Sequence, residues 1–375
     1  MNIDGLITAA LARGASDVHL HAGRAVALRV HGTLINLTGV APPKAADVQA
    51  IAEQLLSPVQ LDYLRRQHAV DAAWTLPSGG RCRVSVFYQR GSIAIAMRLI
   101  PSEIPSLEVL GLPESVSILS SETRGLVLVT GTTGSGKSTT LASLVDKINR
   151  TRPVHILTIE DPIEFVHRDA TAVISQREVG LDVPTFASGF RSALRQDPDV
   201  LLIGEMRDAE TVETALTAAE TGHLVLSTMH TLDASESITR LVSLFPPHQQ
   251  QQIRLQLSRV LRVAVSQRLL PKADGTGRVL AVEVLVSTPY ARECIADRDK
   301  TARLPDVIAA GASEYGMLTF DQSIIDHCLS GRVSPITAEQ WVTNVEEFRM
   351  RLRGFTSGRA TAQPDGGEIE RFGNG

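Results

Sequence analysis

The run GTTGSGKS, from Gly131 to Ser138, combines residue types and a spacing that suit phosphate binding. It fits the pattern G-x-x-x-x-G-K-[ST] and lies between an apolar strand-like run and a helix-like run, as the motif requires. Gly134 and Gly136 allow backbone amides to close around phosphates, Lys137 reaches the β- and γ-phosphates, and Ser138 supplies a Mg²⁺ ligand. The flanking elements disfavour the alternative of a chance glycine-rich turn. The predicted nucleotide-binding residues of this loop are Gly131, Thr132, Thr133, Gly134, Ser135, Gly136, Lys137, Ser138 and Thr139.

A second signal is the run LLIGEMRD, in which the apolar residues Leu201–Ile203 lead to the acid Glu205. A strand that ends there delivers Glu205 to the carboxyl edge of a sheet, beside the phosphate-binding loop. Gly204 occupies the place where an aspartate commonly holds the water shell of the metal. We therefore predict that Glu205 alone orients Mg²⁺ or its waters; the alternative is a solvated acid at a strand end.

The run TIEDPIEFVH places Glu160 and Asp161 at the end of another apolar strand. Pro162 turns the chain, so that Glu164 follows in the next loop. Three carboxylates at a sheet edge are difficult to explain by packing, and one of them could orient or deprotonate the attacking water. We assign this catalytic role to Glu164, with Glu160 and Asp161 beside it. The alternative for any one of them is to cap a backbone or to pair with arginine.

The run ETGHLVLSTMHT places histidines at both ends of a strand. A lone histidine is more often a structural hydrogen-bonding residue than a catalyst. At the far end of a strand parallel to the phosphate-loop strand, His230 could sense the γ-phosphate through its ring N–H, and His223 is included among the predicted nucleotide-binding residues. His19, His21 and His31 lack the spacing of metal ligands, and we interpret them as structural.

The elements that position these residues follow from four apolar runs, GLVLVT, VHILTIE, DVLLIGE and HLVLSTM. Solid apolar runs that alternate with helices indicate a parallel sheet covered on both faces. We therefore predict a RecA-like, doubly wound α/β domain over residues 113–290. The helices predicted between the runs are Ser138–Asn149, Phe186–Arg195 and Ala209–Glu220.

Residues 1–100 are predicted to form a smaller α/β domain. Alternating apolar residues over Arg81–Gln89 and Ile93–Leu99 indicate a hairpin. Its other predicted elements are a helix over Ile3–Arg13, strands around Val18–Leu20 and Ala25–Val30, and a helix near Ala46–Leu55.

The remaining segments connect or follow these two domains. The proline-rich residues 101–112 are predicted to be a linker. Residues 291–355 are predicted to be helical, and the polar, glycine-rich residues 356–375 to be a disordered tail. The helices predicted in the C-terminal region are Asp306–Ala310, Phe320–Leu329 and Ala338–Arg353.

The composition limits the classes of function. The net charge of −4 argues against a protein built mainly to bind nucleic acid, which usually carries a basic stripe. No apolar stretch approaches the roughly 18 residues of a membrane span, and no signal peptide is evident, so we predict a cytoplasmic protein. The three cysteines, Cys82, Cys294 and Cys328, are widely separated and are interpreted as small apolar residues.

Four of the motifs together make the chain resemble a known superfamily. GTTGSGKSTT, ILTIEDPIEFVH, LRQDPDVLLIGEMRD and ETGHLVLSTMHT look like the Walker A, Asp box, Walker B and His box of type II/IV secretion ATPases. Within that superfamily, ASDVHLHAG, RCRVSVFYQRGSIAIAMRLIP and GMLTFDQSI are similar to signatures of the type IV pilus retraction (twitching-motility, PilT-type) motors. The longer N-terminal region and tetracysteine element of extension motors are not seen. The chain departs from the family where STPYARECIAD replaces an Ala-Ile-Arg-Asn signature.

The resemblance implies an architecture and partners. The N-terminal domain would be PAS-like, six chains would form a ring, and ATP would be held between subunits. Arginines of the N-terminal domain would reach the nucleotide, here Arg81, Arg83 and Arg98; the alternative is that these are solvated strand residues. The ring would dock on an inner-membrane platform protein, and the chain would meet the cytoplasmic face of the inner membrane only through that partner.

The predicted function is therefore a homohexameric, ATP- and Mg²⁺-dependent ATPase that powers pilus retraction. A related pilus-assembly or type II secretion ATPase and a nucleotide-binding regulator of another motor remain as alternatives. A RecA-like nucleic-acid motor is disfavoured by the acidic charge balance.

Overall fold

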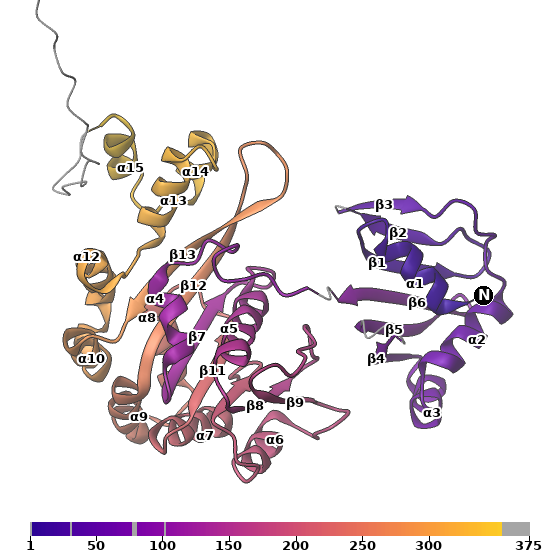
Figure 1. The fold of residues 1–375 in the computed structure, drawn as a ribbon, viewed down its shortest axis with the longest axis horizontal. Coiled ribbons are helices and arrows are strands. Elements are labelled where there is room, and N and C mark those ends of the chain that lie inside the picture. Colours follow the sequence, from indigo (N-terminus) through magenta and orange to yellow (C-terminus); the bar gives the residue numbers. More distant parts are fainter. Residues whose placement is uncertain (1, 31, 77–80, 101–102, 355–375) are drawn as a thin grey trace, which may run out of the picture.

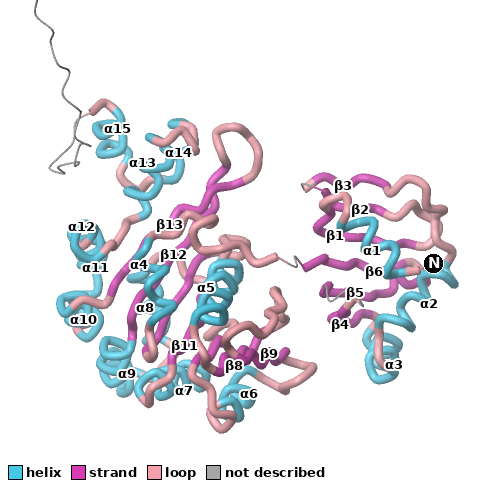
Figure 2. The backbone as a smooth tube through the Cα atoms, in the orientation of Figure 1, coloured by secondary structure: helices cyan, strands magenta, loops and turns pink. Residues whose placement is uncertain are grey.

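The computed structural model describes residues 2–30, 32–76, 81–100 and 103–354. The chain forms two lobes, each built on its own β-sheet, and a single segment after β6 (Ser92–Ile100) joins them (Figure 1). Helices lie against each sheet, as the tube in Figure 2 shows. The structure therefore contains the two α/β units that the sequence predicts.

The N-terminal lobe contains a six-stranded antiparallel sheet in the order β3-β2-β1-β6-β5-β4. Three helices pack on it through an apolar core that includes Ile7, Ile51 and Leu64. The predicted hairpin is confirmed as β5 and β6, whereas β3, α3 and β4 were not foreseen. The elements of this lobe are α1 (Ile3–Leu11), β1 (Ala15–His21), β2 (Ala27–Val30), β3 (Thr33–Asn36), α2 (Ala45–Leu55), α3 (Pro58–Gln67), β4 (Ala69–Thr75), β5 (Arg81–Gln89) and β6 (Ser92–Ile100).

Strand β5 shows how the sheet presents its arginines. Side chains along a strand point alternately to opposite faces. Cys82 and Val84 are buried in the core, so Arg81 and Arg83 lie on the other face. Arg83 is directly opposite Arg98 of β6 in the antiparallel register. The strand period therefore sets two guanidinium groups side by side on the face away from the lobe's own core.

The second lobe contains a seven-stranded sheet in the order β13-β12-β7-β11-β10-β8-β9. The neighbouring strands from β12 to β9 are parallel, which confirms the predicted parallel sheet. Strand β13 runs antiparallel to β12, a difference from that prediction, because the short connection through residues 272–277 permits only a hairpin. The strands are β7 (Gly125–Gly131), β8 (His155–Glu160), β9 (Val173–Glu178), β10 (Val200–Ile203), β11 (Leu224–Met229), β12 (Leu261–Pro271) and β13 (Arg278–Val286).

Apolar clusters cover both faces of this sheet. Leu141 and Ile148 of α5 pack on one face, with Val116 of α4, while residues of α6 to α9 pack on the other. Strands buried on both sides explain why the apolar runs are continuous rather than alternating. The helices of this part are α4 (Glu114–Ser117), α5 (Lys137–Thr151), α6 (Phe186–Ala193), α7 (Ala209–Glu220), α8 (Ala234–Ser243) and α9 (Pro247–Val260).

The C-terminal region is helical, as predicted, with one correction. The single helix expected over Ala338–Arg353 is two helices, because the carboxylate of Asp321 accepts the backbone N–H groups of Thr343 and Asn344 at 2.7 and 2.8 Å. Asn344 then caps the second helix. The helices here are α10 (Pro289–Ala296), α11 (Leu304–Ala310), α12 (Ala312–Tyr315), α13 (Phe320–Leu329), α14 (Pro335–Trp341) and α15 (Val345–Leu352).

The domain boundaries at 100, 112, 290 and 355 stay a prediction. Within the expected linker, Leu107 is buried in the core of the second lobe. The predicted disordered tail, residues 356–375, lies outside the described residues. Among the described helices, none is both long and apolar enough to cross a membrane. The three cysteines are buried and free, in agreement with their interpretation as small apolar residues.

Candidate nucleotide-binding site

The phosphate-binding loop connects the buried strand β7 to α5, which begins at Lys137. Gly131 has a φ of +143°, and a Cβ there would lie 2.6 Å from the Gln267 carbonyl oxygen and 2.5 Å from the Ser135 Oγ. Gly136 caps α5 with a φ of +96°, in the left-handed region. The two glycines therefore allow the tight turn that directs backbone N–H groups and the helix N-terminus at one point.

Lys137 is buried, and its side chain points into the phosphate-binding loop. Its Nζ donates to the carbonyl oxygens of Gly131 at 2.9 Å and Thr132 at 3.0 Å. Burial lowers the pKa of the Lys137 ammonium, and the nearby charges of Glu164 and Glu205 oppose that change. The Lys137 ammonium is thus a partly desolvated positive charge beside backbone amides that also attract anions.

Glu205 follows β10 and is largely buried, with a side chain 11% exposed. Its Oε1 lies 2.6 Å from the Arg207 Nε, and its Oε2 lies 3.5 Å from the His230 Nε2. Burial, followed by the charge of Lys137, lowers the pKa of His230, so the imidazole is neutral near pH 7. The structure therefore brings the predicted Walker B acid and the predicted γ-phosphate sensor into contact.

Gly204 lies where the end of β10 passes close to β8. A Cβ at Gly204 would lie 3.3 Å from both the Ile159 carbonyl oxygen and the Phe186 ring. The Gly204 N–H also donates to that carbonyl at 2.8 Å, and the Gly204 carbonyl accepts from Thr228 Oγ1 at 2.6 Å. A side chain at Gly204 would therefore fit only if the Ile159 carbonyl or the Phe186 ring moved by a few tenths of an ångström.

The acids after β8 have different surroundings. Glu160 accepts hydrogen bonds from Thr158 Oγ1 at 2.7 Å and Gln176 Nε2 at 3.2 Å, and burial raises the pKa of its carboxyl group. Glu164 is 44% exposed, and its Oε1 lies 3.6 Å from an Arg83 Nη of the N-terminal lobe. Asp161 lies at the cavity between them. Only Glu164 combines access to the cavity with a partner from the other lobe.

The cavity above the phosphate-binding loop has a volume of about 490 Å³ and takes its walls from both lobes. Arg83 and Arg98 line it from the N-terminal lobe, so arginines of the same chain reach the loop. The implied approach of these arginines to the nucleotide, and the binding of ATP between subunits, both stay predictions. The predicted residues on its wall are Arg83, Arg98, Thr133, Gly134, Gly136, Lys137, Ser138, Thr139, Glu160, Asp161, Glu164, Glu205 and His230.

Two predicted nucleotide-binding residues lie elsewhere. His223 is at the amino end of β11, where its carbonyl accepts from the Gly125 N–H and its Nδ1 contacts the Ala218 carbonyl at 3.0 Å. Parallel strands place that end at the sheet edge opposite the phosphate-binding loop. Arg81 forms an ion pair with Glu178, the last residue of β9, and is partly buried there. Neither residue lines the cavity within this chain, and their assignment to the nucleotide stays a prediction.

Sequence reasoning missed three ionisable residues on the cavity wall, Arg207, His167 and Arg278. Arg207 and His167 stand inside motifs that were already singled out, and they were passed over in favour of the acids. Burial lowers the pKa of His167 to about 4, so its ring is neutral. Arg278 begins β13, and no local pattern indicates that this strand returns to the phosphate-binding loop.

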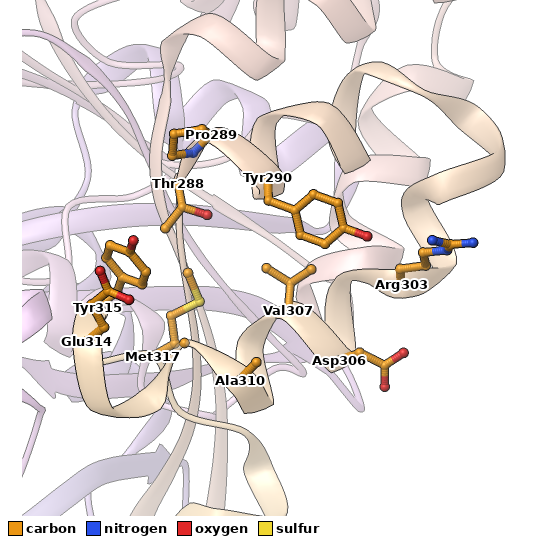
Figure 3. A pocket seen from close by; sticks show the side chains of 11 residues that line it. Thr288, Pro289, Tyr290, Arg303, Asp306, Val307, Ala310, Glu314, Tyr315 and Met317 are labelled. Carbon is orange, nitrogen blue, oxygen red and sulfur yellow. The ribbon is translucent and has the colours of Figure 1, made fainter.

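A larger cavity, about 730 Å³, lies apart from this site among α10, α11 and α12 (Figure 3). Tyr290 and Tyr315 stand on opposite sides of Val307 and Met317, and Arg303 lies beyond the Tyr290 ring. Its wall contains no residue of the phosphate-binding loop. The chemistry discussed above therefore belongs to the smaller cavity.

A parallel sheet with a phosphate-binding loop at its carboxyl edge, and with acids at the ends of neighbouring strands, defines a RecA-like P-loop nucleoside triphosphatase. The model of the family "Type II/IV secretion system protein" matches residues 1–303. The chain belongs to this family, and it is an ATPase.

Individual relatives cover nearly the whole chain. The type IV pilus retractation ATPase PilT of Pseudomonas aeruginosa is 42% identical over 93% of this chain and 100% of its own length. The uncharacterized protein YggR of Escherichia coli is 42% identical over 89% of this chain and 100% of its own. A crystal structure of the pilus retraction motor PilT with bound ADP has a TM-score of 0.85 and 43% identity, covering 92% of this chain and 98% of the other. The predicted fold class and the predicted resemblance to PilT-type motors are confirmed.

Proposed function

We propose that this ATPase is a type IV pilus retraction motor. The observation that carries the proposal is the cavity between the lobes, where Arg83 and Arg98 face the phosphate-binding loop. Lys137 of the second lobe would bind a nucleotide phosphate that the arginines of the N-terminal lobe also approach. Binding and hydrolysis of ATP would then change the position of one lobe relative to the other. The similarity to PilT along the whole chain supports pilus retraction as the use of that movement.

The roles of the site residues follow from their positions. Lys137 and the loop amides bind the β- and γ-phosphates, and neutral His230 donates to the γ-phosphate through a ring N–H. Glu164 orients the attacking water, since it is the acid with access to the cavity and to Arg83. Phosphoryl transfer depends mainly on such positioning and on stabilisation of charge.

The residues present fit Mg²⁺ as a companion of the nucleotide. No cluster of three acidic, histidine or cysteine ligands occurs among the described residues, as expected for an ion that keeps its waters and binds substrate phosphates. Ser138 on the cavity wall and Glu205 at the end of β10 would hold it directly or through water. Bound there, the ion neutralises charge on the phosphates.

We further propose that six chains form a ring that docks on an inner-membrane platform protein at the cytoplasmic face. Membrane association would arise only through that partner, and no nucleic acid is involved, in keeping with the net charge of −4. A ring of six would have six times the 40.4 kDa mass of one chain. Light scattering that finds only single chains under conditions of full ATPase activity would contradict the hexamer.

The segment that departs from the retraction signature is compatible with retraction. It forms α10, so Arg292 stands on a helix, where its Nε contacts Ser287 Oγ at 3.3 Å. Glu293 forms an ion pair with Lys300 of the same chain. The added negative charge is thus neutralised locally, so a partner surface meets little net change.

Deletion of the gene tests this proposal. Cells without the protein should keep surface pili that fail to retract, and wild-type protein should restore twitching while Lys137→Ala should not. Loss of pili on deletion would instead indicate an assembly motor, and retained pili with normal twitching would indicate a secretion or accessory role. Twitching restored by Lys137→Ala would show a regulator that needs no turnover.

A further inference from the structure

A row of polar side chains crosses the sheet beneath the nucleotide site. Thr130 of β7 is the residue before Gly131, and its Oγ1 donates to Ser266 Oγ of β12 at 3.0 Å. Ser266 is in turn directly opposite Glu283 of β13 in the antiparallel register. All three are buried. A polar row in an otherwise apolar sheet costs free energy unless its members have partners.

Glu283 is the charged member of this row. Its Oε1 accepts the backbone N–H of Ala234, the first residue of α8, at 2.9 Å. Burial raises the pKa of Glu283 to about 7. The hydrogen bond from the Ala234 N–H opposes that rise, as does the charge of Arg268 on β12, whereas the charges of Asp233 at the helix end and Asp321 of α13 add to it. This buried acid contacts the start of α8 although Asp233 already caps the helix.

The first turn of α8 is tied to the loop that carries His230. Only residues 231–233 separate His230 from α8. The Leu232 N–H donates to Glu236 Oε2 at 2.7 Å, and Thr231 Oγ1 lies 2.6 Å from Ser237 Oγ. Because α8 holds the loop at both of these points, a shift of its first turn would move His230 relative to Glu205.

We propose that Glu283 is a positioning residue of the ATPase: by accepting the Ala234 N–H, it fixes the start of α8 and thereby the place of His230 at the nucleotide cavity. Glu283 does not line that cavity. The inference rests on the proposed role of His230 toward the γ-phosphate. It links β13, at the edge of the sheet and beside the C-terminal helix α13, to the nucleotide site.

Two substitutions remove the hydrogen bond from opposite sides. Glu283→Leu removes the acceptor, and Ala234→Pro removes the donor at the first helical position, where proline is tolerated. Each should lower kcat about tenfold and leave KM within about twofold, because His230 is misplaced while the phosphate-binding loop is untouched. Glu283→Gln keeps the acceptor and should keep kcat within about twofold of wild type.

A purely structural role would lower thermal stability without changing kcat of the folded protein. A normal kcat in folded Glu283→Leu would overturn the inference. A decrease in kcat in Glu283→Gln as large as that in Glu283→Leu would also overturn it. If Glu283→Leu fails to fold, Ala234→Pro decides in the same way, because it leaves the carboxyl group in place.

A double-mutant cycle separates this inference from the role of His230. His230→Ala combined with Ala234→Pro should be no slower than His230→Ala alone, because the second change acts through the first residue. Losses that multiply would overturn the role of Glu283 and leave that of His230 intact. Full activity of His230→Ala alone would overturn the role of His230, and the inference with it.

Discussion

Glu164 and Glu160 stand four residues apart in one motif, yet only one of them is free to act on a water at the cavity. Glu160 is held by Thr158 and Gln176, whereas Glu164 is 44% exposed and faces Arg83. We expect Glu164→Gln to lower ATP turnover by roughly 10²-fold with ATP affinity nearly unchanged, since a water-orienting carboxylate acts mainly in the transition state. Steady-state hydrolysis and equilibrium nucleotide binding measure the two effects.

Glu160→Gln is the matched control for that substitution. It preserves the acceptor for Thr158 and should change turnover far less than Glu164→Gln. The opposite ranking of the two variants would assign the water to Glu160.

Glu283 gives the stability of the protein a pH dependence of known sign. Its folded pKa of about 7 lies above the ordinary value of 4.5, so the folded state binds this proton more tightly than the unfolded state. The contribution is fully present below about pH 4.5 and is lost as the pH rises toward 7. Glu283→Gln should therefore become more stable than wild type as the pH is raised, by a difference on the order of 3 kcal/mol across this window.

Denaturant unfolding of both proteins at pH 5 and pH 8 measures that difference. A constant offset between the two proteins would mean that Glu283 titrates normally in the folded state.

At the scale of elements, the junction of β7 and the phosphate-binding loop depends on Gly131. A Cβ there would lie 2.5 Å from the Ser135 Oγ and 2.6 Å from the Gln267 carbonyl oxygen, a backbone atom of β12, so the loop or the strand would have to shift. We expect Gly131→Ala to weaken ATP binding at least about tenfold, because the loop amides shift away from the phosphates. Fluorescent-nucleotide titration measures the affinity.

Gly275 provides the control for Gly131→Ala. It also has a positive φ, +74°, but nothing lies within 4 Å of its Cβ position. Gly275→Ala carries backbone strain without a clash and should bind ATP normally. Equal losses in both variants would show that strain, and not close approach, is what matters at Gly131.

Those parts of the fold that carry a continuous local pattern were predictable. The four apolar runs became β7, β8, β10 and β11, and the acids at their ends met at one edge because parallel strands share a direction. Strand β9, whose sequence VISQRE is only partly buried at the sheet edge, has no comparable run. Nor does the local sequence reveal that Arg278 returns to the site, since that depends on pairing of β13 with β12.

A similar explanation holds for the two predicted residues that do not line the cavity, His223 and Arg81. His230 was placed at the phosphate edge because its strand was predicted to run parallel to the phosphate-loop strand, and β11 does so. The same direction puts His223 at the opposite edge, a consequence that the prediction for His223 left out. Arg81 and Arg83 lie on the same face of β5, so the local sequence does not distinguish them. The packing of the two lobes pairs Arg81 with Glu178 and Arg83 with Glu164.

At the scale of the whole molecule, both halves of the nucleotide cavity belong to one chain. We therefore expect no complementation between Lys137→Ala chains, which keep the arginines, and Arg83→Gln/Arg98→Gln chains, which keep the phosphate-binding loop. Mixed assemblies should hydrolyse ATP no faster than the more active parent. Restored activity on mixing would show that a neighbouring chain supplies the arginines.

The two ion pairs between the lobes differ in their access to solvent. Arg83 and Glu164 are 35% and 44% exposed, whereas Arg81 and Glu178 are 15% and 9% exposed. Mobile ions screen exposed pairs far more than buried ones. Raising the ionic strength should thus free Arg83 from Glu164 while Arg81 keeps the lobes together. Added potassium chloride would then weaken the Arg83–Glu164 contact at the nucleotide cavity at a lower concentration than it weakens the Arg81–Glu178 contact between the lobes.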